Sequence, residues 1–323
     1  MNFLKKQSVL LGVLGAVLLG WLFPEWGASG GYLRSEIVTK VGVVIIFFLQ
    51  GLGLPYEKFR EGVADIRLHF FSLGWNFLLA PLLGIAFAAL GAFWLPQEVT
   101  WGLLYVSVLP TTIFSAVAFV AMAEGNVAGA IFSTALSNIA GVFITPLWVS
   151  VLIIAGSPVD FDLGSMLGKL FVLIVLPMVA GQALHGLAEP LLSKLKPITK
   201  PLNAWIINFM VFAAFANSMQ SDAWGQFSVH TLLILVALTL AFLGIVSGLV
   251  WWSSGLVGMS RDSRIAAFFC GSQKTLAAGV PMATTLFAGL PIEESLGILL
   301  IPLLIYHPSQ LILASIVLNK NDS

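Results

Sequence analysis

Charged residues are scarce in this chain, and no aspartate or glutamate lies well inside any of its long apolar runs. Lysine, arginine, aspartate and glutamate together make up 9% of the 323 residues, whereas hydrophobic residues make up 59%. Soluble domains carry about 25% charged residues, so this scarcity excludes a soluble protein and a nucleic-acid partner. The chain is therefore predicted to be an integral membrane protein, with the lipid bilayer as its partner.

Several motifs and residue types are also missing, and each absence excludes a class of protein. The single cysteine, Cys270, excludes an internal disulfide and a cysteine metal cluster. No phosphate loop or nucleotide fingerprint occurs, which leaves ATP-driven transport without support. The apolar runs lack the paired acids or metal triad that an intramembrane enzyme needs. We therefore expect no enzyme and no cofactor, with a bound Na⁺ or H⁺ as the open exception.

Long apolar runs are what the chain does contain, and they predict an all-α fold with ten membrane-spanning helices. A helix rises about 1.5 Å per residue, so about 20 apolar residues cross the hydrocarbon layer. The runs show no alternation of period two, which favours helices over a closed barrel. The predicted spans are 8–23, 37–54, 68–94, 101–122, 127–154, 165–187, 201–219, 229–257, 263–288 and 295–318.

The first run has a second interpretation, because Lys5 and Lys6 precede it as they would precede the apolar part of a signal peptide. Cleavage would leave nine spans and would destroy the internal symmetry described below. We therefore assign this run to the first span.

Positive charges are concentrated on one side of the predicted spans. With the N-terminus inside, eleven lysines and arginines fall in inner segments, and at most three, Arg34, Lys40 and Lys169, fall on the outer side. Lysine and arginine are enriched in cytoplasmic loops, so both termini are predicted to be cytoplasmic. The inner residues are Lys5, Lys6, Lys58, Arg60, Arg67, Lys194, Lys196, Lys200, Arg261, Arg264 and Lys320.

The spans repeat along the chain. Spans one, three and four recur as spans six, eight and nine after about 160 residues, and because five is odd the two halves run in opposite directions. A 5+5 inverted-topology repeat of this kind is typical of secondary transporters, which hold substrate and ions near the midplane at discontinuous helices. The first repeat is predicted to be 1–157 and the second 158–323.

Polar residues interrupt two of the runs at equivalent positions of the repeats. The string Cys270-Gly271-Ser272-Gln273-Lys274-Thr275 lies inside span nine, where a lysine costs about 2.5–3.5 kcal/mol on insertion scales. One repeat earlier, Pro110 is followed by Thr111, Thr112 and Ser115 inside span four. Proline removes a backbone donor and clashes with the preceding turn. Spans four and nine are therefore predicted to be discontinuous helices that cross each other in the membrane.

These motifs resemble the bile acid/sodium symporter superfamily, and in particular its SBF-like branch. The resemblance covers essentially the whole chain, and the string from Cys270 to Gly279 carries it most specifically. It implies a panel domain built from spans 1, 2, 6 and 7 and a core domain built from spans 3–5 and 8–10. The two domains are implied to move relative to each other for alternating access.

The resemblance also implies an ion-coupling site. Members that are coupled to sodium use polar residues of spans three, four, five and nine, and the matching residues here are Asn76, Ser115, Thr134 and Gln273. A sodium ion held by these residues would lie beside Ser272 as well. Lys274 is the fifth residue that we assign to the coupling site.

Three departures from the family pattern alter this site, and two of them change its charge. The family glutamate is Phe269 here, and the two asparagines are Ala116 and Lys274. An ammonium is added where a carboxylate is lost, so Lys274 is predicted to stand in for sodium and to hold carbonyls at the helix ends. Coupling to sodium, coupling to protons through Lys274, and uncoupled uniport all stay open. A permanently charged Lys274 would instead bind an anionic substrate.

The substrate is expected between the core and the panel. The candidates for binding it are Thr111, Thr112, Lys274, Thr275, Asn208 and His307. Serine and threonine hydroxyls in membrane helices often bond to their own backbone, so helix capping is the alternative role for the hydroxyl residues. Hydrogen bonding to a neighbouring helix is the alternative for Asn208 and for a neutral His307.

Together these features predict a secondary active transporter that moves a small organic, anionic solute. The short loops suit a bacterial inner (plasma) membrane, and the resemblance implies a monomer. The rival interpretation is an uncoupled channel or a regulatory membrane protein that keeps the transporter fold, because the sodium site is eroded. A continuous water path, or a lack of any stabilisation by ligands, would favour the rival.

Overall fold

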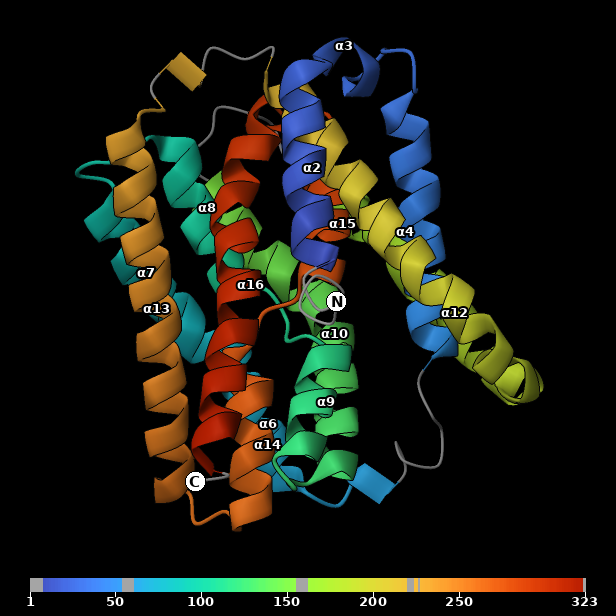
Figure 1. The fold of residues 1–323 in the computed structure, drawn as a ribbon, viewed down its shortest axis with the longest axis vertical. Coiled ribbons are helices and arrows are strands. Elements are labelled where there is room, and N and C mark those ends of the chain that lie inside the picture. Colours follow the sequence, from blue (N-terminus) through green and yellow to red (C-terminus); the bar gives the residue numbers. More distant parts are fainter. Residues whose placement is uncertain (1–7, 54–60, 155–161, 220–223, 226, 322–323) are drawn as a thin grey trace. The chain divides into compact units, whose positions relative to one another are not determined.

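Helices are the only regular elements in the residues that the computed structural model describes, which are 8–53, 61–154, 162–219, 224–225 and 227–321 (Figure 1). Within these residues, seven helices are long and apolar enough to cross a membrane. They are Ser35–Leu52, Ile66–Gly91, Val127–Ile153, Gly164–Gly186, Pro197–Ser218, Val229–Leu256 and Pro291–Leu318. The chain is therefore an all-helical, multi-pass membrane protein.

The other three predicted spans contain helices that are shorter than a full crossing. The first, α2 (Ser8–Leu22), has 15 residues. The fourth span is divided into α8 (Gln97–Val108) and α9 (Phe114–Met122), and the ninth into α14 (Arg261–Ser272) and α15 (Leu276–Leu286). Both interruptions that the polar residues predict are thus present, and they account for two of the three missing full-length helices.

The chain divides into two compact units. The first unit comprises residues 1–53, 159–228 and 280–301, and the second comprises 54–158, 229–279 and 302–323. The predicted boundary between the sequence repeats, at residue 157, lies outside the described residues. The assignment of spans to a panel and a core domain remains a prediction.

The first unit is built around the long helix α12 (Leu176–Ser218), on which α2 and α4 pack (Figure 1). The bounds of its other elements are α3 Pro24–Gly27, α4 Ser35–Leu52, α11 Leu163–Leu170, the π-helix η3 Phe171–Val175 and the 3₁₀-helix η5 Pro291–Ser295. The segment around Lys194, where the sequence predicts a connection between two spans, has helical geometry within α12. The apolar spans Gly164–Gly186 and Pro197–Ser218 lie on either side of it, and Leu173 and Ala213 line the same cavity, so the chain reverses its direction between them.

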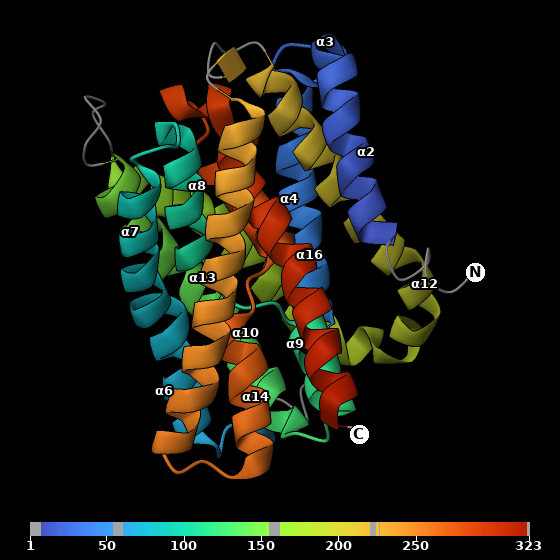
Figure 2. The ribbon, with the colours of Figure 1, turned by 60° about the vertical axis from the view of Figure 1, so that its left-hand side comes forward.

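The second unit contains both helix interruptions, together with the beginning of α15 up to Gly279. Its remaining elements are α6 Ile66–Gly74, the π-helix η1 Trp75–Leu79, α7 Ala80–Gly91, α10 Val127–Val149, the π-helix η2 Ser150–Ile154, α13 Val229–Leu256 and the second half of α16 Leu296–Asn321. Helix α14 packs against α6, α9, α10 and α13 (Figure 2). A buried apolar cluster that includes Leu68, Val120, Ala130 and Phe269 joins these helices below the interruptions.

Candidate functional site

The two helix interruptions of the second unit meet at Lys274. After α8 ends, Leu109 has an extended backbone with ψ of 149°, and after α14 ends Gln273 has an extended backbone with ψ of 150°. The N–H of Thr275 donates to the carbonyl of Pro110 at 3.1 Å and joins the two extended segments. The side chain of Lys274, which lies at this junction, is completely buried.

The Lys274 ammonium donates to three backbone carbonyls. Its Nζ lies 2.8 Å from the oxygen of Ser107, 2.8 Å from that of Leu109 and 3.2 Å from that of Asn76. An ammonium has three N–H donors, so each donor has an acceptor. Burying a charge is costly unless the charge is hydrogen-bonded, and here the carbonyl oxygens supply those bonds. The three carbonyl oxygens therefore satisfy the buried amino group of Lys274.

Local backbone geometry explains why these three carbonyls are free to accept. Ser107 and Leu109 lie at the end of α8, where helix carbonyls lose their intrahelical donors. In the π-helix η1 the N–H of Ala80 donates to Trp75, five residues earlier. The corresponding donor for Asn76 would be Pro81, which has no N–H. The carbonyl of Asn76 is thus left for the Lys274 ammonium.

Side chains of neighbouring helices satisfy the other carbonyls of the span-four interruption. Thr145 Oγ1 donates to the carbonyl of Val108 at 2.7 Å, and Asn138 Nδ2 donates to that of Thr111 at 2.8 Å. With the bonds already given for residues 107, 109 and 110, five consecutive carbonyls accept from outside their own helix. Hydrogen bonds from neighbouring segments therefore satisfy the whole interruption, and Lys274 donates two of the five.

Helix α16 holds the span-nine interruption through two side chains whose role the sequence analysis missed. The Gln310 amide accepts from the N–H of Lys274 at 2.7 Å and donates to its carbonyl at 2.8 Å. The Tyr306 hydroxyl donates to the carbonyl of Ser272 at 2.7 Å. The sequence did contain a signal for Gln310. It is a polar residue within the predicted span 295–318, and it lies three residues after His307, on the same face of a helix.

His307 belongs to the same cluster. Gln310 Nε2 lies 2.9 Å from His307 Nδ1, and that ring nitrogen lies 3.3 Å from the carbonyl of Lys274. The two hydrogens of the Gln310 amide can serve both Nδ1 and the Lys274 carbonyl, which would place the imidazole proton on Nε2. His307 thus lies beside the interruption, where its ring contacts the backbone of Lys274 and the side chain of Gln310.

Three of the residues predicted for the coupling site also meet here. Asn76 Nδ2 donates to the carbonyl of Cys270 at 2.9 Å. The Ser115 hydroxyl lies between Gln273 Oε1, at 3.2 Å, and Thr112 Oγ1, at 3.0 Å. Among the described residues, three buried polar atoms of this cluster have no hydrogen-bond partner, and they are Asn76 Oδ1, Thr111 Oγ1 and Gln273 Nε2. Each of these atoms keeps a donor or an acceptor unused.

The other predicted residues make local contacts. The hydroxyls of Thr134 and Ser272 donate to carbonyls of their own helices, at Ile131 (3.1 Å) and Phe268 (2.6 Å). Thr275 Oγ1 accepts from the N–H of Ala278 and begins α15. Asn208 belongs to the first unit, where its side chain faces Gly12 on α2, and its Oδ1 is buried without a partner among the described residues.

The backbone carbonyls around Lys274 do not fit a bound sodium ion. The carbonyls of Asn76, Ser107 and Leu109 already accept from an ammonium, which would repel a second cation. The position of the family glutamate is occupied by Phe269, a buried ring that stacks on Phe119 with centroids 5.6 Å apart. The described residues contain no group of three or more His, Cys, Asp or Glu side chains that could hold a metal ion.

Known proteins resemble this chain over nearly its whole length. The sequence profile of the SBF-like CPA transporter family matches residues 7–321. The putative symporter YfeH of Escherichia coli is 30% identical over 315 residues, which are 96% of this chain and 91% of the relative. Sodium/bile acid cotransporter 7 of Danio rerio is 28% identical over 319 residues, 97% of this chain and 93% of the relative. An uncharacterized protein of Pseudomonas aeruginosa is 30% identical over 314 residues, 97% and 92% of the two chains.

These matches confirm the family resemblance that the span-nine motif indicates. They also confirm the prediction of a transporter rather than an enzyme. The polar interruption around Lys274 lies within the matched residues. The chain therefore belongs to the SBF-like CPA transporter family.

Proposed function

We propose that this protein is a secondary active transporter of a small organic anion, and that the Lys274 ammonium takes the place of a bound sodium ion. The observation that carries the proposal is the set of three hydrogen bonds from this buried ammonium to the carbonyls of Asn76, Ser107 and Leu109. Transporters with inverted repeats hold ions at discontinuous helices of this kind. A tethered cation at that position removes the need for sodium.

Alternating access needs a structure that can open to either side of the membrane, and the proposal includes such a structure. The ten spans form two inverted repeats of five, spans four and nine cross at their interruptions, and a core domain moves against a panel domain. Support comes from the interruptions at Leu109–Thr112 and Gln273–Thr275, which lie about 160 residues apart, as the repeat requires.

The proposed orientation places both termini in the cytoplasm and the protein in the inner membrane, as a monomer. The uneven distribution of lysine and arginine supports it. Four of the inner residues, Lys5, Lys6, Lys58 and Arg60, lie outside the described residues.

Lys274 couples transport to protons in this proposal. Loss of its proton would remove the charge that the three carbonyls share and weaken the junction of the two interruptions. Thr111 supports a solute contact beside this junction, because its buried hydroxyl has no partner among the described residues. Thr112, Thr275 and His307 surround the same junction. Sodium appears in the names of the vertebrate relatives, and the proposal departs from them at Phe269 and Lys274.

The test is the thermal stability of the purified protein in detergent at fixed ionic strength, in sodium against potassium or choline. A ligand that binds only the folded state at about 100 times its Kd stabilises by about 2.7 kcal/mol. We expect no sodium-specific rise for the wild type. We also expect a change of stability with pH that Lys274→Asn abolishes.

A gain-of-function variant sharpens this test. Phe269→Glu combined with Lys274→Asn restores the carboxylate and amide that sodium-coupled members carry, so sodium should stabilise this variant more than potassium does. A sodium-specific rise in the wild type that Gln273→Ala abolishes would contradict the proposal and would leave Lys274 as a solute contact. Because the wild type is measured by itself, this outcome can be read even if the double variant folds poorly.

A further inference from the structure

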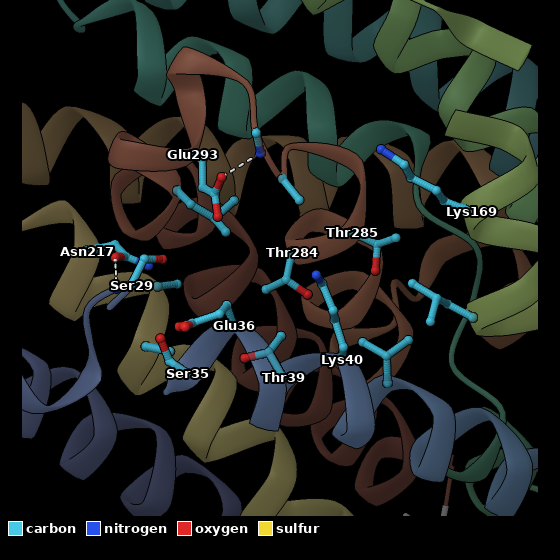
Figure 3. A pocket seen from close by; sticks show the side chains of 17 residues that line it. Ser29, Ser35, Glu36, Thr39, Lys40, Lys169, Asn217, Thr284, Thr285 and Glu293 are labelled. Carbon is cyan, nitrogen blue, oxygen red and sulfur yellow. Dashed lines mark hydrogen bonds between the residues drawn. The ribbon is translucent and has the colours of Figure 1, made fainter. Parts of the chain in front are cut away.

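A cavity of about 290 Å³ lies within the first unit, and none of the residues at the Lys274 junction lines it (Figure 3). Its walls come from the first half of α4, the end of α11, the end of α12, the end of α15 and η5. Four charged side chains line it, and they are Glu36, Lys40, Lys169 and Glu293. Ligand pockets span about 300–1,000 Å³, so the volume suits a small solute.

The two carboxylates of the cavity hold the loops at its rim. Glu36 Oε2 accepts from the N–H of Gly30 at 3.4 Å, and Glu293 Oε2 accepts from the N–H of Gly289 at 2.5 Å. Both glycines have left-handed backbones, with φ of +77° and +78°, which other residues rarely adopt. The carboxylates thus have backbone partners of their own.

The two lysines of the cavity have no such partners. Among the residues that the structure describes, neither Lys40 nor Lys169 makes a hydrogen bond or an ion pair, although two carboxylates line the same cavity. Figure 3 shows Lys40 reaching up between Thr284 and Thr285, and Lys169 entering from the side of α11. Both threonine hydroxyls donate to the carbonyl of Pro281 at 2.9 Å, which leaves their oxygens as acceptors.

We propose that this cavity binds the anionic group of a small organic solute, a carboxylate or sulfonate, between the ammonium groups of Lys40 and Lys169. The oxygens of Thr284 and Thr285 accept from hydroxyl or amino groups of the same solute. Lys40 and Lys169 lie at the outer ends of their spans by the count of positive charges, so the cavity is an external loading site. The inference rests on the proposed function in two respects, since it takes the bound solute to be the transported one and takes the outer side from the proposed orientation.

Selective labelling of one introduced cysteine tests the charge of the cavity. The native Cys270 is completely buried, so Thr285→Cys provides the accessible thiol. The probes are an anionic sulfonatoethyl and a cationic trimethylammonioethyl methanethiosulfonate. The cavity is lined by two lysines and two glutamates, so the preference depends on the lysines lying nearer to the introduced thiol than the carboxylates do. The ratio of anionic to cationic rates at Thr285→Cys should therefore exceed that at the exposed Tyr32→Cys.

Matched variants show whether the lysines cause this preference. Adding Lys40→Gln and Lys169→Gln should bring the rate ratio down to that of Tyr32→Cys. Lys194→Gln, which removes an exposed lysine that does not line the cavity, should leave the ratio unchanged. An unchanged ratio in the double variant overturns the proposal. Ala288→Cys, which also lines the cavity, serves if Thr285→Cys fails to fold.

Protection experiments identify the source of the anion. In nanodiscs of phosphatidylcholine, succinate should slow the labelling of Thr285→Cys, whereas the neutral succinamide should not. Slower labelling on addition of phosphatidylglycerol, without protection by succinate, would mean that the lysines bind lipid phosphate and would overturn the solute site. The Lys274→Asn variant should keep the rate ratio and the protection by succinate, so failure of the proposed coupling and failure of this site are distinguishable.

Discussion

Three backbone carbonyls determine which side chain residue 274 can carry. The oxygens of Asn76, Ser107 and Leu109 converge on Lys274 Nζ, at the end of a long side chain that starts from the segment between α14 and α15. Removing the donor would leave three buried acceptors unpaired, and each costs about 1–3 kcal/mol.

Lys274→Met is therefore expected to lower the free energy of unfolding by at least about 3 kcal/mol, because methionine fills a similar length without donating. Thermal unfolding in detergent measures the effect. Lys194→Met is the control, since Lys194 is exposed on α12 and its replacement should change stability by less than about 0.5 kcal/mol. Equal melting temperatures for Lys274→Met and the wild type would show that the carbonyls have other donors.

Gln310 is expected to matter nearly as much, although it carries no charge. Gln310→Leu leaves the N–H of Lys274 unpaired and leaves its carbonyl with only the 3.3 Å contact to His307 Nδ1, which should cost about 1–3 kcal/mol in the same assay. Ser309→Ala, one residue away, removes only a hydroxyl bond to Ile305 within its own helix and should be nearly neutral. Similar losses in the two variants would argue against a specific role for the amide.

Single polar residues in apolar runs were the strongest signal in the sequence, and they led to Lys274, Gln273 and Thr111. The partners of Lys274 were not predictable in the same way. Its acceptors are backbone carbonyls, and the one on Asn76 becomes free only because η1 has π geometry before Pro81. Pro81 indicates in the sequence that one upstream carbonyl lacks a donor, but the π geometry decides which one, and no residue type marks that geometry.

Helix contacts in the first unit depend on paired glycines. A Cβ at Gly51 on α4 would collide with the carbonyl of Met178, and one at Gly181 on α12 would collide with that of Phe48. The two backbones therefore touch where these glycines lie, as small residues allow in membrane proteins.

Gly51→Ala is expected to destabilise the protein by about 1–3 kcal/mol, because the backbones must move apart. Gly186→Ala is the control, since a Cβ there meets nothing within 4 Å, and its replacement should be neutral or slightly stabilising. Thermal unfolding of the two variants side by side gives the comparison. A neutral Gly51→Ala would mean that the two helices do not approach as described.

At the level of helices, the sequence predicts interruptions better than ends. Pro110 and the polar string at Cys270–Thr275 correctly marked α8, α9, α14 and α15. The connection between the predicted spans six and seven keeps helical geometry around Lys194, within α12. Two separate apolar spans, Gly164–Gly186 and Pro197–Ser218, still lie on either side of it. Lysine is a good helix former, so the chain does not have to leave the helical state where it connects two spans.

For the whole molecule, the proposed orientation predicts which residues an impermeant maleimide reaches. Tyr32→Cys, exposed at 81% between α3 and α4, should be labelled from outside intact cells. Lys194→Cys should be labelled only after the cells are opened. Cys270 is buried and supplies a silent background. Labelling of Lys194→Cys in intact cells would reverse the orientation and place the cavity of Lys40 and Lys169 on the cytoplasmic side.

The covalent attachment of the cation at residue 274 has an electrical consequence. A sodium ion crosses with its solute and compensates the solute's charge, whereas a lysine that keeps its proton stays behind. A monovalent anion would then move as a net negative current, and an inside-negative potential opposes its uptake by about 2.3 kcal/mol per 100 mV. The proton coupling proposed for Lys274 removes this penalty, because a proton that travels inward with each monovalent anion leaves no net charge to cross the potential.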